Sequence, residues 1–181
     1  MSEDGGPLLH FSEDPSITRF VPHVPPTNPT QSPGVWAIDE EHAPVYWFPR
    51  DCPRGAVWAT TAAEHEVLRS TFLTTARRVH AAELGWLERI RRAELYVYAL
   101  DRGPFERWPD ANGQWIARTT VEPISVRPVG DLLARHAEAG IELRLLPELG
   151  PFWRAVMNSG LPFSGIRLRN ARGGIPVERA G

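Results

Sequence analysis

Proline is unevenly distributed along this chain, and its positions exclude regular secondary structure from much of the first third. Ten of the 18 prolines lie within residues 1–54 of the 181-residue sequence, and five of them fall within residues 21–33. Proline fixes the backbone φ angle and lacks the N–H group that helices and sheets need. We therefore expect a proline-rich loop over residues 21–33, and residues 40–54 are too interrupted to form one long helix.

Short apolar runs on both sides of this loop predict strands. Residues 8–11 form the first run and residues 35–38 the second, and Val57 with Trp58 closes a third. Later strands are rich in β-branched, aromatic or alternating apolar residues and are expected at residues 95–100, 115–118, 124–126, 141–146 and 164–169. Shorter helices are expected at residues 129–139 and 147–158.

One long helix is predicted over residues 62–93. Thr61 and Glu64 have the spacing of a capping box, in which each side chain binds the backbone N–H of the other residue at the helix start. An apolar stripe follows at helical spacing through Leu68, Phe72, Ala76, Val79, Trp86 and Ile90. Gly85 is expected to kink or divide this helix, because glycine costs about 1 kcal/mol relative to alanine there.

The order of these elements predicts the fold class. Strands precede and follow the long helix without regular strand–helix alternation, which favours an α+β fold with a mixed or antiparallel sheet over a doubly wound one. The length fits a single domain over residues 1–181. Residues 171–181 are expected to form a frayed tail.

Composition excludes several classes of chemistry. All 20 basic residues are arginine, so a lysine Schiff base and the lysine grip of a P-loop are impossible. The six histidines have no HxH or HExxH spacing, and we expect no metal site. Residues 1–54 hold three arginines and eight carboxylates, whereas residues 55–181 hold 17 and 14. This polarity is too weak to demonstrate nucleic-acid binding by charge alone.

Other features bear on location and on the single cysteine. Residues 1–7 lack the basic and apolar pattern of a secretion signal, and no apolar run approaches the roughly 20 residues that span a bilayer. We expect a cytoplasmic protein with no membrane segment. Cys52 lies between Arg50 and Arg54, whose charges would lower the thiol pKa and favour a thiolate nucleophile. A small buried filler is the alternative.

Five residues have the side chains of a nucleotide pocket. His10 and Ser12 lie at the end of the first predicted strand, where they could hydrogen-bond a ribose. Tyr46 or Trp47 could stack on a planar ring, and Arg50 could neutralise a pyrophosphate through paired donors. In the alternative interpretation His10 is a satisfied strand-end histidine, the aromatic residues are core, and Arg50 pairs with a neighbouring carboxylate.

Four segments resemble a bacterial family of about this length that is known only as a domain of unknown function. They are residues 8–17, 35–54, 121–123 with 129–133, and 163–170, and they span nearly the whole chain. The resemblance implies membership and no activity.

A second resemblance begins at the first strand. The His-Phe-Ser run from His10 to Ser12, followed by Ala-Pro-Val-Tyr-Trp-Phe-Pro-Arg at residues 43–50, resembles the opening of ADP-ribosyltransferase-like domains. The likeness is to DNA-targeting toxins that carry a His-Phe-Thr strand and a proline–aromatic–Pro-Arg segment. It implies NAD as a substrate, and a nucleic acid or a protein as acceptor.

The same resemblance implies roles for individual residues. His10 and Ser12 would hold NAD, Tyr46 or Trp47 would face the nicotinamide ring, and Arg50 would contact the phosphates or the transferred group. Such domains also use a glutamate on a late strand, for which Glu122 is the best match. Its carboxylate would stabilise the oxocarbenium-like state of the breaking glycosidic bond and orient the acceptor.

Two further functions remain open. Transfer of an RNA 2′-phosphate to NAD uses several arginines, which Arg50, Arg54 and Arg118 could supply. The competing class is a non-enzymatic binding or interaction module that keeps the same fold. An enzyme predicts that His10, Arg50 and a carboxylate converge in one pocket, whereas a module predicts these residues apart or covered by aromatic side chains.

Overall fold

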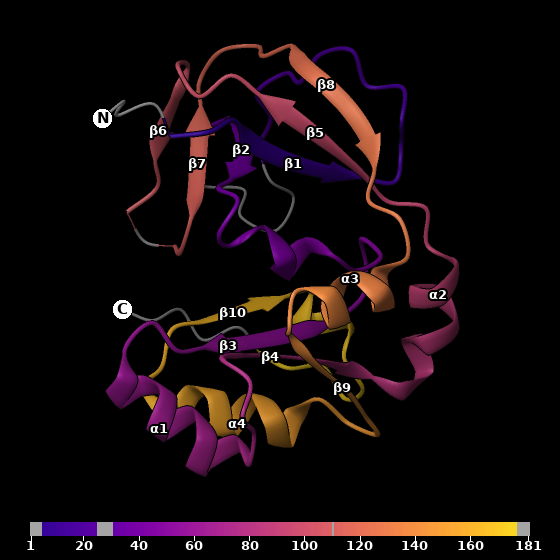
Figure 1. Ribbon diagram of the computed structural model, residues 1–181. Helices are drawn as coiled ribbons and strands as arrows, with labels where there is room; N and C mark the ends of the chain where they lie inside the picture. Colours follow the sequence, from indigo (N-terminus) through magenta and orange to yellow (C-terminus); the bar gives the residue numbers. More distant parts are fainter. Residues whose placement is uncertain (1–4, 25–30, 110, 177–181) are drawn as a thin grey trace. The chain divides into compact units, whose positions relative to one another are not determined.

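The computed structural model describes residues 5–24, 31–109 and 111–176 (Figure 1). The chain forms two compact units. Unit 1 comprises residues 1–46 and 94–129, and unit 2 comprises residues 47–93 and 130–181. Each unit contains its own sheet, and the predicted α+β class is confirmed. The division into units leaves the expected single domain a prediction.

Unit 1 is built on a six-stranded sheet in the order β6-β7-β2-β1-β5-β8. All of its neighbouring strands run antiparallel. The elements are β1 (Leu8–Ser12), β2 (Val35–Ile38), the 3-10 helix η1 (Ala43–Tyr46), β5 (Tyr96–Leu100), β6 (Phe105–Arg107), β7 (Gln114–Ala117) and β8 (Pro123–Pro128). The short apolar runs therefore form strands close to their expected positions.

The two faces of this sheet differ in what covers them. Successive side chains of a strand point to opposite faces, so Leu8 and His10 of β1 share one face and Leu9 and Phe11 the other. The first face carries the buried core of unit 1, in which Leu8 is fully buried. The buried members of this core are Leu8, Phe20, Val35, Ala37, Tyr98, Leu100, Phe105, Ala117 and Val121.

Unit 2 is built on a four-stranded mixed sheet in the order β10-β3-β4-β9. Within the described part of this sheet, β4 and β9 run parallel, whereas the β10–β3 and β3–β4 pairs are antiparallel. The strands are β3 (Arg54–Trp58), β4 (Arg78–Glu83), β9 (Glu142–Leu146) and β10 (Phe163–Ile166). The helices are α1 (Ala62–Phe72), η2 (Leu84–Trp86), α2 (Leu87–Arg92), α3 (Leu132–Glu138), α4 (Gly150–Ser159) and η3 (Leu168–Asn170).

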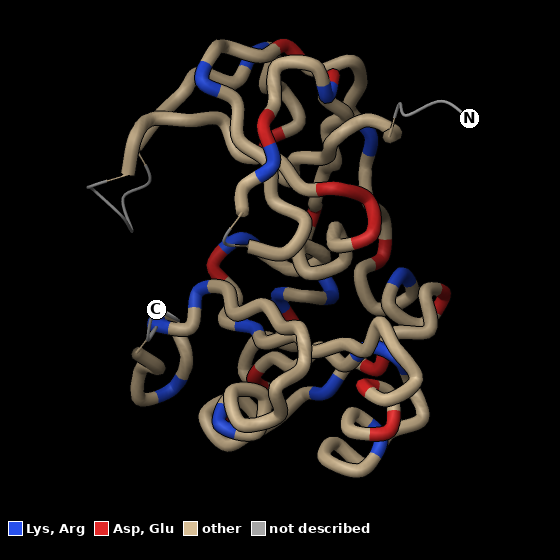
Figure 2. The backbone as a smooth tube through the Cα atoms, turned by 90° about the vertical axis from the view of Figure 1, so that its left-hand side faces the viewer, with Lys and Arg blue, Asp and Glu red and all other residues tan. Residues whose placement is uncertain are grey.

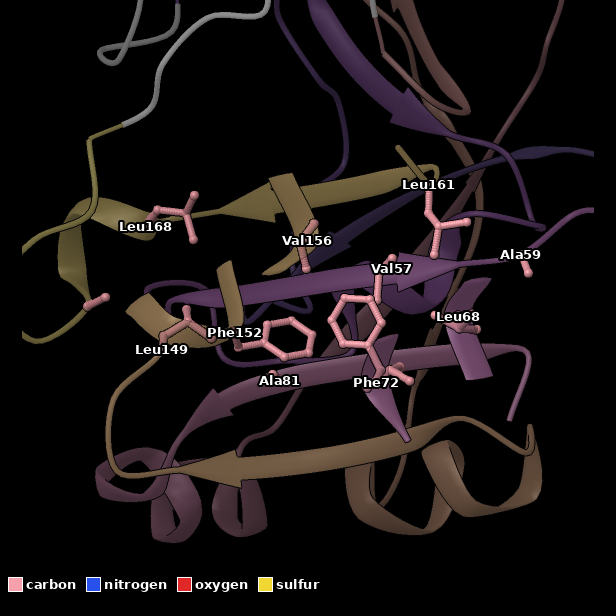
Figure 3. Close-up of a cluster of buried hydrophobic side chains, with 12 residues drawn as sticks. Val57, Ala59, Leu68, Phe72, Ala81, Leu149, Phe152, Val156, Leu161 and Leu168 are labelled. Atoms are coloured by element: carbon pink, nitrogen blue, oxygen red, sulfur yellow. The ribbon is translucent and has the colours of Figure 1, made fainter. Parts of the chain in front are cut away.

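Helices α1 and α4 cover one face of this sheet and bury its core. Figure 3 shows Phe72 of α1 and Phe152 of α4 side by side next to Val57 of β3, and their ring centroids are 5.4 Å apart. At about 25 cal/mol per Å² of buried apolar surface, such packing is the dominant stabilising contribution. Helix α3 packs on β9, and its side chain His136 meets His80 of β4 on the sheet face opposite to the α1–α4 core.

The prediction of one long helix over residues 62–93 is wrong. Helix α1 ends at Phe72, and its C-cap residue Leu73 adopts the left-handed conformation with φ 51°. The chain then enters β4, which pairs with β3 on one side and β9 on the other. Val79 is fully buried as expected, but as a strand residue. Val79 lies seven residues after Phe72, which matches two helical turns. The same position also suits an inward-facing residue of a strand that begins after a turn.

The two segments expected to lack regular structure are partly ordered. The proline-rich loop is closed at its base by backbone hydrogen bonds between His23 and Gly34, while residues 25–30 lie outside the described residues. In the expected tail, Ala171 is buried and the Ile175 N–H donates to the Leu168 carbonyl at 3.1 Å. Residues 177–181 lie outside the described part. No helix within the described residues is long and apolar enough to cross a membrane.

The capping box at the start of α1 is confirmed and supplies a stability prediction. The Thr61 hydroxyl accepts a hydrogen bond from the Glu64 N–H at 3.1 Å, and the Glu64 carboxylate accepts one from the Thr61 N–H at 3.0 Å. We expect Thr61→Ala to lower the free energy of unfolding by about 1 kcal/mol, since a helix N–H loses its partner. Urea unfolding followed by circular dichroism measures this loss.

Thr71→Ala is the matched control for the cap. Thr71 lies in the same helix with an exposed side chain, and alanine is the better helix former. Thr71→Ala should therefore leave stability unchanged or slightly raised. An equal loss in both variants would contradict the assigned role of the cap.

Candidate functional site

His10 and Ser12 are held by contacts within unit 1. The His10 Nδ1–H donates to the Trp36 carbonyl oxygen at 2.8 Å, and the His10 ring lies 4.6 Å from the Phe20 ring, centroid to centroid. The buried Ser12 hydroxyl accepts a hydrogen bond from the Asp14 N–H at 3.1 Å. Both side chains therefore have structural partners on the core face of the sheet.

Tyr46 lies on the other side of the same sheet. It ends η1, and its ring stacks on Phe11 with centroids 5.9 Å apart and planes 9° from parallel. Phe11 follows His10 directly in β1, so the two side chains point to opposite faces. The structure therefore does not bring His10 and Tyr46 to one face of unit 1.

The other residues predicted for the site have separate surroundings. Glu122 is exposed between Val121, which pairs with Phe20, and the first residue of the edge strand β8. Trp47 and Arg50 belong to unit 2. The Trp47 ring meets the His136 ring at 5.7 Å, while Arg50 is an exposed residue.

The two further arginines suggested for phosphate transfer bind backbone carbonyls. Arg118 donates to the carbonyls of Ser32 and Pro33 at 3.1 and 2.9 Å, and so fastens the end of the proline-rich loop. Arg54 is buried in unit 2 and donates to the Cys52 carbonyl at 2.9 Å. An arginine used in this way has fewer donors left for a phosphate.

A small cavity lies on the sheet face that carries Phe11. Its volume is about 200 Å³ and it is lined by Pro7, Leu9, Glu40, Val97, Ala99, Ser125 and Arg127. The strand register explains this set, since Leu9 pairs with Ala99, Ala99 with Ser125, and Val97 with Arg127. Paired residues share a face. The cavity therefore has an apolar floor and three polar side chains, of which Arg127 is positive and Glu40 negative.

Two buried histidines of unit 2 were not among the residues predicted for the site. His80 and His136 are 0% and 1% exposed, and the His80 Nδ1 and His136 Nε2 atoms are 3.0 Å apart. The His136 Nδ1 lies 2.7 Å from the Leu132 carbonyl, so it must donate, which leaves the His136 Nε2 as an acceptor. We therefore assign the proton on His80 to Nδ1.

This assignment leaves the His80 Nε2 as a buried lone pair without a hydrogen-bond partner among the described residues. Burial, His136, Arg78 and Arg54 hold the pKa of His80 well below its usual range. Burial also lowers the pKa of His136. Of the two charged side chains on its helix, Arg135 lies over the Trp47 ring and Glu138 is exposed. Both imidazoles are therefore neutral at neutral pH.

The sequence left Cys52 open between a thiolate nucleophile and a buried filler, and the structure buries its side chain completely. Burial raises its pKa to about 12, a larger effect than the lowering by Arg54. The thiol therefore stays protonated at neutral pH and Cys52 is a buried filler. The described residues contain no group of three or more His, Cys, Asp or Glu side chains that could hold a metal ion.

A sequence signal for the histidine pair exists but is weak. Residues 78–83 alternate as a strand, which would have placed His80 on the face opposite to Val79 and Ala81. His136 lies one helical turn after the buried Leu132, so it shares the inward stripe of α3. Neither pattern indicates that the two rings meet.

Comparison with known proteins gives one match. The sequence model of a family of unknown function (DUF6886) matches residues 9–171. No curated protein and no solved structure shows a significant match. The resemblance to ADP-ribosyltransferase-like domains therefore stays a prediction.

The histidine pair predicts an acid-sensitive fold. Histidines whose folded pKa is lowered bind protons more readily when unfolded, so their contribution to stability is complete above about pH 6.5, the usual histidine pKa. We expect the free energy of unfolding to fall as the pH drops below that value, by up to about 1.4 kcal/mol per pH unit for each proton. Urea unfolding between neutral and mildly acidic pH measures the slope.

A double variant isolates the pair from the other titrating groups. His80→Leu with His136→Leu replaces both partners with apolar groups and should flatten the slope, because no buried imidazole remains to be protonated. His23→Gln, at an exposed histidine, should keep the wild-type slope. A double variant with an unchanged slope would assign the acid sensitivity to other groups.

Proposed function

The chain belongs to the DUF6886 family, whose function is unknown, and we propose a function from its geometry. We propose that it is a non-enzymatic module that binds a small nucleotide of the NAD class on the sheet face of unit 1 that carries Leu9. The observation that carries this proposal is the cavity with an apolar floor and polar rim. A few polar groups around an apolar surface are the usual composition of a ligand pocket. The lining residues come from three neighbouring strands and the segments beside them.

The floor of the cavity suits a flat ring. Leu9, Val97 and Ala99 come from β1 and β5, whose paired backbone makes the surface rigid. Its volume of about 200 Å³ is below the roughly 300–1,000 Å³ of pockets for drug-sized ligands. The cavity would therefore enclose one ring and part of a ribose, and the rest of a dinucleotide would lie outside.

The rim supplies the polar recognition. The Arg127 guanidinium offers paired donors for a phosphate, and the Glu40 carboxylate accepts from ribose hydroxyls or an amide. Ser125 can donate or accept. The exposed fractions of these three side chains leave them accessible to a ligand.

The absence of catalytic convergence favours binding over turnover. Within unit 1, His10 and Ser12 serve the core face, Tyr46 stacks on the other face, and Glu122 is exposed at the sheet edge. A glycosyl-transfer site needs its nucleophile-orienting carboxylate and its ribose-holding groups around one bond. No such arrangement is present among the described residues of unit 1.

Calorimetry with NAD tests the proposed pocket. We expect NAD to bind the wild type, and Arg127→Ala to weaken binding by about tenfold or more, because a charge-assisted hydrogen bond is lost. Ala99→Leu should block the cavity by filling its floor. No binding of NAD at millimolar concentration would overturn the proposal.

Two matched variants make the test specific to this face. Arg107→Ala removes an exposed arginine from the far edge strand β6, and His10→Ala changes the opposite face of β1. Both should retain NAD binding if they fold, as judged by circular dichroism. Loss of binding in His10→Ala with intact Arg127→Ala binding would favour the NAD-holding role of His10 instead.

An NAD-using transferase is the second candidate, with a nucleic acid or a protein as acceptor. The stacking of Tyr46 on Phe11 favours it, because Phe11 lies two residues from Leu9 of the cavity floor on the same face. An aromatic ring is thus close to the place where a nicotinamide could bind.

Release of nicotinamide from NAD tests this second candidate. If Glu122 orients the acceptor, Glu122→Gln should abolish nicotinamide release while NAD binding persists, because the amide keeps the size and loses the charge. Glu106→Gln, at an exposed glutamate of β6, is the control. Nicotinamide release by Glu122→Gln at the wild-type rate would show that Glu122 does not orient the acceptor. If the wild type releases no nicotinamide, the non-enzymatic binding module is the better proposal.

A further inference from the structure

Charge is segregated between the two units more strongly than between the first 54 residues and the rest of the sequence. Unit 2 contains 15 arginines and ten carboxylates, a net charge of +5, whereas unit 1 contains five arginines and 12 carboxylates, a net charge of −7. The overall charge of −2 conceals this difference. A positively charged unit in an acidic chain indicates an anionic partner for that unit.

The positive charge of unit 2 is concentrated next to its edge strand β10. Arg167, Arg169 and Arg172 fall within six residues, and no carboxylate occurs between residues 163 and 176. Two hydrogen bonds join this segment to the loop before β3. The Arg167 Nε donates to the Arg50 carbonyl at 3.4 Å, and the Asn170 side chain donates to the Asp51 carbonyl at 2.8 Å.

We call Arg50, Arg167, Arg169 and Arg172 the arginine edge. Figure 2 shows Lys and Arg positions in blue along the chain next to its C-terminal end. Arg169 and Arg172 are exposed and have no ion pair with a carboxylate among the described residues. Arg167 has a long contact of 3.9 Å with Asp51, which screening by solvent makes weak.

The backbone beneath these arginines is firmly anchored. Leu168 and Ala171 are 1% and 6% exposed, and the Arg172 N–H donates to the buried Glu83 carboxylate at 2.9 Å. The same carboxylate accepts from the Leu149 N–H, just before α4, at 3.2 Å. The exposed guanidinium groups therefore project from an ordered scaffold, which reduces the entropy cost of binding.

We propose that the arginine edge binds the phosphate backbone of a nucleic acid. A guanidinium binds phosphate oxygens through two parallel donors, and several of them spaced along one segment fit a polymer with repeated phosphates. An anionic membrane fits less well, since it would be held by charge alone, without the additional binding that inserted apolar side chains give. The apolar residues of this segment are turned inward, Leu168 and Ala171 being buried and Ile175 packing on the core.

Fluorescence anisotropy with a labelled single strand of roughly 20 nucleotides, as RNA and as DNA, tests the proposal on the full chain. We expect the wild type to bind at low salt, with affinity falling as salt rises. The double variant Arg169→Gln, Arg172→Gln should bind about tenfold more weakly. Its logarithmic salt dependence should be smaller by roughly 1.4, or about 0.7 for each lost phosphate contact.

A control variant with the same loss of charge distinguishes an effect of the arginine edge from an effect of the protein's net charge. The double variant Arg69→Gln, Arg91→Gln changes two exposed arginines on α1 and α2 and should bind within about twofold of the wild type. Equal weakening in both double variants would overturn the assignment to this edge. No binding of either nucleic acid at low salt would overturn the proposal.

Two further probes distinguish other anionic partners. Vesicles containing phosphatidylserine and a polyglutamate peptide should bind more weakly than the nucleic acids at equal ionic strength. Tighter binding of either probe would replace the nucleic acid with a membrane or an acidic protein. The double variant Arg169→Gln, Arg172→Gln should bind NAD as the wild type does. The outcome for the arginine edge is therefore independent of the outcome for the cavity of unit 1.

Discussion

The alternation of side chains along β1 organises unit 1. This strand pairs with β2 and β5, so it cannot slide or rotate without breaking the ladder on both sides. His10 is therefore committed to the core face with Phe20, while Leu9 and Phe11 face the cavity and the Tyr46 ring. A shift by one residue would exchange the two sets of side chains and destroy both the core and the cavity. The proposed binding site therefore depends on which residues of β1 face the cavity and which face the core.

In unit 2, several polar side chains are buried and make hydrogen bonds within the unit. His80 and His136 stay neutral and bond to each other, Arg54 binds the carbonyls of the preceding loop, and Glu83 binds the N–H groups that begin α4 and follow η3. Each of these side chains makes at least one such hydrogen bond, and an unpaired buried polar group costs roughly 1–3 kcal/mol; among the described residues the His80 Nε2 is left without a partner. The charged side chains that a binding partner can reach are therefore on the surface, where Arg169 and Arg172 of the arginine edge are exposed.

Local sequence patterns were sufficient for the elements whose signals act within a few residues. The capping box of Thr61 and Glu64 and the strand at residues 95–100 are confirmed, since caps and alternation depend on near neighbours. Residues 78–83 were misassigned because Val79 fits a helical stripe and a strand equally well, and pairing with β3 and β9 decides between them. None of the residues predicted for the site lines the cavity that contains Arg127, and the sequence indicated neither this cavity nor the contact between the two histidines.

By itself the sequence determined the family, the α+β class, the exclusion of lysine chemistry and the richness in arginine, because these follow from composition and from patterns within a few residues. Only the tertiary structure decided that His10 and Tyr46 point to opposite faces of a sheet, that His80 meets His136 across 56 positions, and that arginines collect in one unit. The physical reason is that faces, pairs and charge clusters are made by residues far apart in the chain. Their proximity depends on strand pairing and core packing, which no local pattern encodes.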